Sequence, residues 1–236
     1  MRPLLILQHF WSETPGTFEE VFVQQAVPYR KMKLYEGEGL PVSLSPYSGL
    51  LLMGGPMGVH DEDQYPWLVE EDRILKEALA HEMPILGVCL GSQLIAKAAG
   101  GKVTAGPRKE IGWYTLQLTA DATRDPLFMG FPRQFEAFEW HGDIFELPAG
   151  AFPLASSELY PYQAFRIGSR AYGLLFHLEI TEAMVNQFCS LFSGELQEVK
   201  DYIQETSILE DLPRRVSHLQ VLARETFGRF CRLLAD

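Results

Sequence analysis

The stretch that decides the fold is "PILGVCLGSQLIAKAAGG", residues 84–101. In it a short apolar run, Ile85–Val88, ends at Cys89 between two glycines, and a run with helical character, Leu90–Ala99, follows directly. A short uninterrupted apolar run is typical of a strand buried on both faces of a sheet. The small–x–Cys–x–small pattern predicts a cramped strand-to-helix turn that projects the cysteine side chain from the end of that sheet.

Strands and helices alternate through the first part of the chain. Two further apolar runs, Leu4–Leu7 and "GLLLMGG" at 49–55, predict buried strands, the second ending in a glycine loop. Helical spacing of apolar residues predicts helices over Thr17–Ala26 and Tyr65–Glu82. Such alternation indicates parallel βαβ units in an open sheet, which places ligands at the carboxyl ends of its strands.

The middle of the chain has a different pattern. The segments "IGWYTLQLT", "RQFEAFEWH", "YQAFRI" and "AYGLLFHLE" are rich in aromatic residues and predict further strands, partly antiparallel. From Thr181 onward the spacing is helical again. We therefore expect an α/β domain over residues 1–180, with an open, mostly parallel central sheet flanked by helices, and a C-terminal helical extension over 181–236 packed on the same domain.

Charge and cysteine content narrow the function classes. The net charge of -11 and the pI near 5.0 argue against a nucleic-acid partner. The three cysteines, Cys89, Cys189 and Cys231, form no CxxC pair, so neither a disulfide framework nor a zinc site is expected. The N-terminus lacks a signal-peptide cleavage pattern, and no apolar run reaches membrane-spanning length. These features predict a cytoplasmic protein without a membrane partner.

Cys89 is a candidate nucleophile. The predicted helix after it presents unpaired N–H groups and the positive end of its dipole, which should lower the pKa of the thiol. The Leu90 N–H would point to where a tetrahedral oxyanion forms. The alternative is a small buried cysteine that only fills a tight turn.

His177 and Glu179 could complete a catalytic group. They lie two residues apart in "YGLLFHLEIT", and in a strand their side chains would share a face. The histidine could take the thiol proton and pass it to a leaving amine, while the glutamate holds the other ring nitrogen. In "MGGPMG", residues 53–58, Gly54 and Gly55 would let a second backbone N–H reach the oxyanion. A core histidine, a solvated strand end and a simple turn are the alternatives.

The motifs "GVCLGSQLIAKAAGGKV", "MGGPMGV" and "FHLE" together resemble the class I (triad) glutamine amidotransferase family. The likeness is to stand-alone members similar to the glutaminase domain of GMP synthase, and "EIGWYTLQLT", "WHGD" and "QAFRIG" continue it. It covers roughly residues 45–181 and implies a flavodoxin-like sheet. It also implies Cys89 as nucleophile, His177 as general base and acid, and Glu179 as the residue that orients the histidine.

The resemblance implies further contacts with the substrate. Gly55 and Leu90 would supply the oxyanion N–H groups. Gln93 would contact glutamine, and a loop would present the backbone of Trp140 and Asp143 to its α-amino and α-carboxylate groups. His141, in the same loop, is assigned no chemistry.

The implied reaction is attack of a thiolate on the γ-carboxamide of glutamine, loss of ammonia and hydrolysis of a γ-glutamyl thioester. It uses no metal and no organic cofactor, and we interpret "HDEDQ" at 60–64 as a polar loop and helix start. Leu178 stands where the family usually has proline between the histidine and glutamate. Leucine can adopt the same extended backbone, so we expect activity to be retained.

Several roles fit these motifs. The chain carries no G-x-x-x-x-G-K-[ST] phosphate loop, so an amidotransferase subunit would serve a separate synthase. A stand-alone γ-glutamyl peptidase or hydrolase would use the same triad with another leaving amine. A non-catalytic regulatory protein on this fold is the alternative of another class, although the intact triad argues against it. A related cysteine-elbow fold with other chemistry is a further alternative. The C-terminal helices could cover the sheet or form a surface for a partner or a homo-oligomer.

Overall fold

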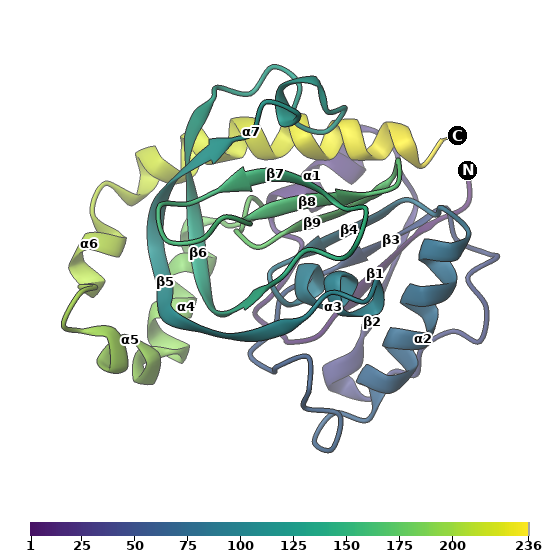
Figure 1. The fold of residues 1–236 in the computed structure, drawn as a ribbon, viewed down its shortest axis with the longest axis horizontal. Helices are drawn as coiled ribbons and strands as arrows, with labels where there is room; N and C mark the ends of the chain where they lie inside the picture. Colours follow the sequence, from purple (N-terminus) through teal and green to yellow (C-terminus); the bar gives the residue numbers. More distant parts are fainter. Residues whose placement is uncertain (236) are drawn as a thin grey trace.

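The computed structural model of the chain describes residues 1–235. Within these residues a nine-stranded sheet runs through the molecule in the order β2-β1-β3-β4-β9-β8-β7-β5-β6 (Figure 1). Helices pack on both of its faces. The predicted fold class, an open mixed sheet flanked by helices with a helical C-terminus, is confirmed.

The first half of the sheet is parallel. Every neighbouring pair from β2 to β9 runs in parallel, and the residues of all these strands except β2 are buried. Three strands predicted from apolar runs are confirmed, although the glycine loop after residue 52 lies outside its strand. The parallel strands are β1 (Leu4–Gln8), β2 (Tyr29–Lys33), β3 (Gly49–Leu52), β4 (Ile85–Val88) and β9 (Ala171–Leu174).

The second half of the sheet is antiparallel, as the aromatic middle segments predicted. A long hairpin of β5 and β6 forms the far edge, and β7 and β8 join it to β9. β9 pairs in parallel with β4 and antiparallel with β8, so it links the two halves. These strands are β5 (Val103–Leu118), β6 (Gln134–Phe145), β7 (Phe152–Ser156) and β8 (Ala164–Ile167).

Alternating side chains of the parallel strands face two separate apolar cores. Leu5 and Leu7 of β1 pack with α2 (Trp67–Ala80) and α3 (Leu90–Ala98). Leu4 and Ile6 pack in the core that α1 (Thr17–Gln24) shares with the C-terminal helices. The first two predicted helices are therefore confirmed, each about two residues shorter at one end or both. Two short 3-10 turns, Leu34–Glu36 and Ala122–Arg124, complete the elements before the extension.

The C-terminal region is helical from residue 182, and its side chains enter the same core as α1. Phe227 stacks on Phe18 with ring centroids 3.9 Å apart, and it meets Phe22 edge-on at 4.7 Å. Thr181 caps the first of these helices by accepting a hydrogen bond from Met184 N. The division at residue 180 stays a prediction. The helices are α4 (Glu182–Leu191), α5 (Ser193–Val199), α6 (Glu205–Leu209) and α7 (Leu212–Leu233).

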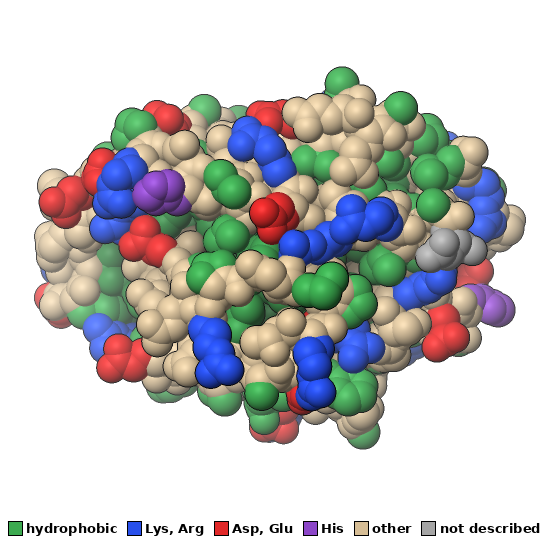
Figure 2. All heavy atoms as spheres, turned by 90° about the horizontal axis from the view of Figure 1, so that it is seen from above, with side chains coloured by type: hydrophobic (Ala, Val, Ile, Leu, Met, Phe, Trp, Pro, Cys, Tyr) green, Lys and Arg blue, Asp and Glu red, His purple; other side chains and the backbone are tan. Residues whose placement is uncertain are grey.

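On the face shown in Figure 2, acidic and basic side chains are interspersed with apolar ones. Within residues 1–235, no helix combines the length and the apolar character needed to cross a membrane.

Candidate active site

Cys89 occupies a strained turn between β4 and α3. Its backbone angles are φ 49° and ψ -110°, a region that costs a residue with a side chain about 1–3 kcal/mol. A Cβ at Gly87 would lie 2.5 Å from the Gly91 backbone, and one at Gly91 would lie 2.5 Å from the carbonyl oxygen of Leu52. The two glycines are therefore needed because α3 starts directly against β3 and β4, and the cysteine is held where the chain reverses.

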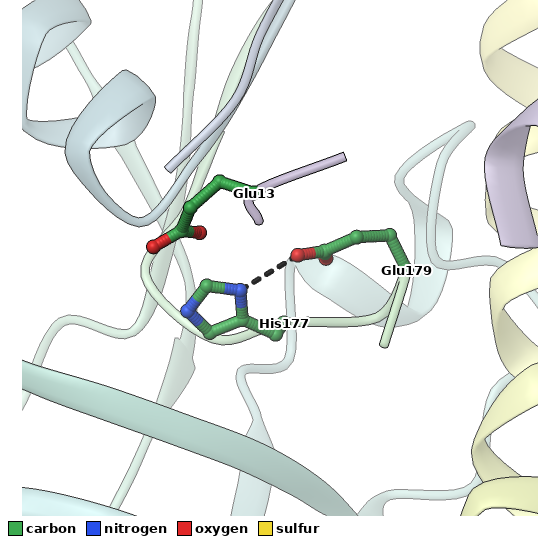
Figure 3. Close-up of side chains that lie close together, drawn as sticks. All are labelled: Glu13, His177 and Glu179. Carbon is green, nitrogen blue, oxygen red and sulfur yellow. Dashed lines mark hydrogen bonds and ion pairs between the residues drawn. The ribbon is translucent and has the colours of Figure 1, made fainter. Parts of the chain in front are cut away.

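His177 and Glu179 form a buried, hydrogen-bonded pair (Figure 3). His177 Nδ1 donates a hydrogen bond to Glu179 Oε1 over 2.6 Å, since a carboxylate can only accept. That bond leaves Nε2 of the imidazole without a hydrogen-bond partner in residues 1–235, on the side of the Cys89 thiol. The thiol itself points to the carbonyl oxygen of Trp140, 3.6 Å from Sγ.

The expected reason for the His177–Glu179 contact was wrong. β9 ends at Leu174, so the two residues lie beyond the strand, where His177 makes only an isolated bridge to Phe138. The His177 N–H donates to the Phe138 carbonyl over 2.8 Å, which anchors the imidazole. Leu178, at the family's usual proline position, is fully buried in the core, and the pair forms with leucine there.

Burial dominates the electrostatics of Cys89. It raises the pKa of the thiol, while the neighbouring His177 acts in the opposite direction. The expected net lowering by the α3 N-terminus is therefore not found. Burial lowers the pKa of His177, but Glu179 and Cys89 outweigh it, so that this pKa is raised well above its ordinary value. The thiol proton thus has a strong acceptor next to it.

The glycine loop after β3 is held by a buried histidine that the sequence analysis missed. His9 Nδ1 donates to the Met53 carbonyl over 2.8 Å, and Nε2 donates to Glu71 over 2.9 Å. Burial lowers the pKa of His9, but the Glu71 charge outweighs it and the net pKa is raised. The available signal was Glu71, which stands on the buried face of α2 beside Leu75. This pair fixes the loop that contains Gly55.

Gln93 and the predicted substrate loop also meet. Gln93, in the first turn of α3, donates from Nε2 to the Asp143 carbonyl over 3.2 Å. Trp140 and Asp143 lie within β6 and not in a loop, so that expectation was wrong. The pairing of β5 with β6 is irregular between Ala105 and Glu110, so β5 bulges opposite this segment.

A cavity of about 210 Å³ opens at Cys89 and collects most of the predicted residues. Cys89, Gly55, Gln93, Trp140 and Asp143 line it, whereas His177, Glu179 and Leu90 lie behind its walls. Four further lining residues, which the sequence motifs did not predict, come from the loop after β1, from the β5 bulge and from the C-terminal helical region: Glu13, Lys109, Phe192 and Glu195.

His141 belongs to a second buried cluster and not to a loop. Its Nε2 lies 3.0 Å from Glu110 and 3.4 Å from Glu139, and Gln163 Nε2 donates to Glu110 over 2.5 Å. Burial and the Glu110 charge raise the pKa of Glu139 well above its ordinary value. The cluster adjoins the cavity, because His141 is also one of the residues that line it.

Among the described residues, two groups of side chains bring three potential ligand atoms within 4.8 Å of one another: Glu13, His177 and Glu179, and Glu110, Glu139 and His141. The acidic segment at 60–64 is not among them. There Asp61 accepts from Gly58 N over 2.7 Å and Glu62 pairs with Lys97, which suits the expected polar loop.

A family model described as "Glutamine amidotransferase class-I" matches residues 24–187. The chain belongs to this family. The glutamine amidotransferase-like protein YfeJ of Salmonella typhimurium is 34% identical over 172 residues, which cover 72% of this chain and 71% of that protein. The GMP synthase of Thermomicrobium roseum is 38% identical over 141 residues, 58% of this chain but only 24% of the synthase. The chain thus spans about a quarter of that synthase.

The likeness to solved structures covers the whole chain or nearly all of it. A glutamine amidotransferase from Thermotoga maritima has a TM-score of 0.88 and 33% identity, with 100% of both chains covered. A glutamine amido transferase from Methylobacillus flagellatus has a TM-score of 0.91 and 31% identity, over 99% of this chain and 95% of that one. The C-terminal helices are therefore part of the shared fold.

Proposed function

We propose that this protein hydrolyses the γ-carboxamide of glutamine and releases ammonia for a separate synthase. The observation that carries the proposal is the strained Cys89 turn facing the free nitrogen of an imidazole, whose other nitrogen is held 2.6 Å from Glu179. Nucleophile, base and orienting acid are the elements of a catalytic triad.

The cycle begins when His177 Nε2 takes the thiol proton and Cys89 Sγ attacks the amide carbon. The resulting oxyanion accepts hydrogen bonds from the N–H groups of Gly55 and Leu90, the latter at the unpaired start of α3. His177 then returns the proton to the amine nitrogen, the C–N bond breaks and ammonia leaves. A water, deprotonated by the same imidazole, hydrolyses the γ-glutamyl thioester and restores the thiol.

Recognition of the glutamyl part would fall to Gln93, Trp140 and Asp143. The Gln93–Asp143 hydrogen bond already orders this wall, so little entropy is lost when substrate binds. The GMP synthases that match the chain are named as glutamine-hydrolysing, and the chain aligns with about a quarter of one such synthase. In this proposal a partner synthase supplies the acceptor chemistry. The three cysteines are free and buried, which suits the reducing cytoplasm.

The test is release of glutamate and ammonia from glutamine by the wild type beside Cys89→Ala, with circular dichroism to check the fold. Cys89-dependent release of both products in equal amounts supports the proposal. Preferential hydrolysis of a γ-glutamyl dipeptide would instead identify a stand-alone γ-glutamyl peptidase. Equal release by the variant would overturn the assignment of the nucleophile.

A further inference from the structure

Glu13 is a buried acid in the cavity wall that the proposed cycle does not use. It lies in the loop between β1 and α1, lines the cavity with Cys89 and is only 4% exposed. Its Oε2 has no hydrogen-bond partner within residues 1–235. A buried, unpartnered carboxyl oxygen is costly, so its presence beside a nucleophile needs a reason.

The position of Glu13 relative to His177 suggests that reason. A Cβ at Gly54 would clash with Glu13 Oε2 and would lie 3.4 Å from His177 Cε1. A carboxyl oxygen of Glu13, a ring nitrogen of His177 and a carboxyl oxygen of Glu179 also lie within 4.8 Å of one another. Figure 3 shows the Glu13 carboxyl on this side of the imidazole, with Glu179 on the other nitrogen. Because His177 Nε2 must protonate the leaving amine, that amine would lie next to Glu13.

We propose that Glu13 determines leaving-group specificity: its carboxylate accepts a hydrogen bond from the N–H of a primary carboxamide and repels a leaving group that carries its own carboxylate. The inference rests on the proposed function and narrows its substrate class. Glutamine would be favoured because ammonia is uncharged when it leaves. A γ-glutamyl dipeptide would be disfavoured, since the amine of its leaving amino acid is one carbon away from a carboxylate.

The charges around the cavity agree with this role. Burial raises the pKa of Glu13 to about 7, with His177 and His9 lowering it and Glu179 and Glu195 raising it. Glu13 is therefore negative above neutral pH and neutral below it. Lys109, a cation in the cavity lining, is compensated by Glu195 and Glu198, each 2.9 Å from its Nζ.

Alkylation of Cys89 tests the charge of Glu13 without any turnover. Neutral iodoacetamide and anionic iodoacetate react with the same thiolate, so the ratio of their rates reports the charge that an incoming group meets. At about pH 8.5 Glu13 is charged, so Glu13→Gln should lower the ratio of the iodoacetamide rate to the iodoacetate rate about tenfold. At about pH 5.5 Glu13 is already neutral, so the substitution should hardly change this ratio. In the wild-type protein, the ratio of the two rates should fall by the same factor as the pH is lowered from about 8.5 to about 5.5. Peptide mass analysis separates Cys89 from Cys189 and Cys231.

The matched control is Glu182→Gln, which removes one negative charge at an exposed residue outside the cavity lining. It should leave the ratio unchanged. In turnover, Glu13→Gln should shift the preference between glutamine and γ-glutamylglycine toward the dipeptide about tenfold. The inference would be overturned if Glu13→Gln left the alkylation ratio unchanged, or if it reduced the turnover of glutamine and of γ-glutamylglycine by the same factor. A shifted alkylation ratio without any glutamine turnover would support the placement of Glu13 and contradict the proposed function.

Discussion

The imidazole of His177 and the carboxylate of Glu179 lie 2.6 Å apart, with both side chains fully buried and both residues just outside the sheet. Burial keeps water from competing for this hydrogen bond, so the carboxylate fixes both the tautomer and the plane of the ring. The nitrogen left free is the one that faces Cys89. We therefore expect the reactivity of Cys89 to depend on Glu179, which would act through His177.

Glu179→Gln tests that dependence. An amide can donate as well as accept, so the glutamine would stabilise the wrong histidine tautomer and would not balance an imidazolium. We expect the rate constant of glutamine hydrolysis to fall about 10³- to 10⁴-fold, as happens when the acid of a triad becomes an amide. Steady-state kinetics measure it, with the exposed Glu182→Gln as control. A fall of less than about tenfold would mean that Glu179 does not orient the base.

Gly91→Ala tests whether the elbow needs its glycine. The new Cβ would lie 2.5 Å from the backbone oxygen of Leu52, which cannot move without disturbing β3. We expect a loss of about 2 kcal/mol or more in the free energy of unfolding. The control is Gly194→Ala in α5, where a Cβ meets nothing within 4 Å and helix propensity favours alanine. Urea denaturation of both variants gives the comparison, and equal stabilities would contradict it.

The C-terminal helices make a separate prediction. Phe227 of α7 is fully buried against Phe18 and Phe22 of α1, so Phe227→Ala would open a cavity between the two helices. We expect destabilisation of about 3–5 kcal/mol. Val221→Ala, at a position on the same helix that is 55% exposed, should change stability by less than about 0.5 kcal/mol. Equal unfolding midpoints for the two variants would mean that α7 is a detachable appendage.

The raised pKa of Glu13 has a consequence for stability. Its pKa is raised from 4.5 to about 7, so between these values the native state binds more protons than the unfolded state, and stability falls as pH rises. Glutamine does not ionise, so Glu13→Gln removes this decrease in stability with rising pH. The variant should match wild type at about pH 4.5 and be more stable by as much as about 3 kcal/mol at about pH 8. Urea unfolding at the two pH values checks it, and a variant that is less stable at the higher pH would show that Glu13 is paired.

Much of the fold could be predicted because its central strands are buried on both faces. β1, β3 and β4 are short apolar runs, and the two glycines around Cys89 are required by close backbone packing. The edge strand β2, with the sequence YRKMK, is partly exposed and carries no such run, so it was not predicted. A hydrophobic pattern in the sequence reveals a strand only where its residues are buried, and an edge strand is partly exposed.

The candidate site was predictable where chemistry is local in sequence. His177 and Glu179 are neighbours in the chain, and their pairing was predicted, although the shared strand expected to pair them ends at Leu174. Glu13 and His9 reach the site only because β1 lies next to β3, a relationship fixed by sheet order. The motifs do not specify which distant acid ends beside the nucleophile.

The γ-glutamyl thioester on Cys89 is the central claim, and hydroxylamine tests it most directly. When wild-type protein is incubated with glutamine and hydroxylamine, the account predicts γ-glutamylhydroxamate at the expense of glutamate, and none from Cys89→Ala. Glutamate release without any hydroxamate, or hydroxamate formed equally by Cys89→Ala, would contradict it.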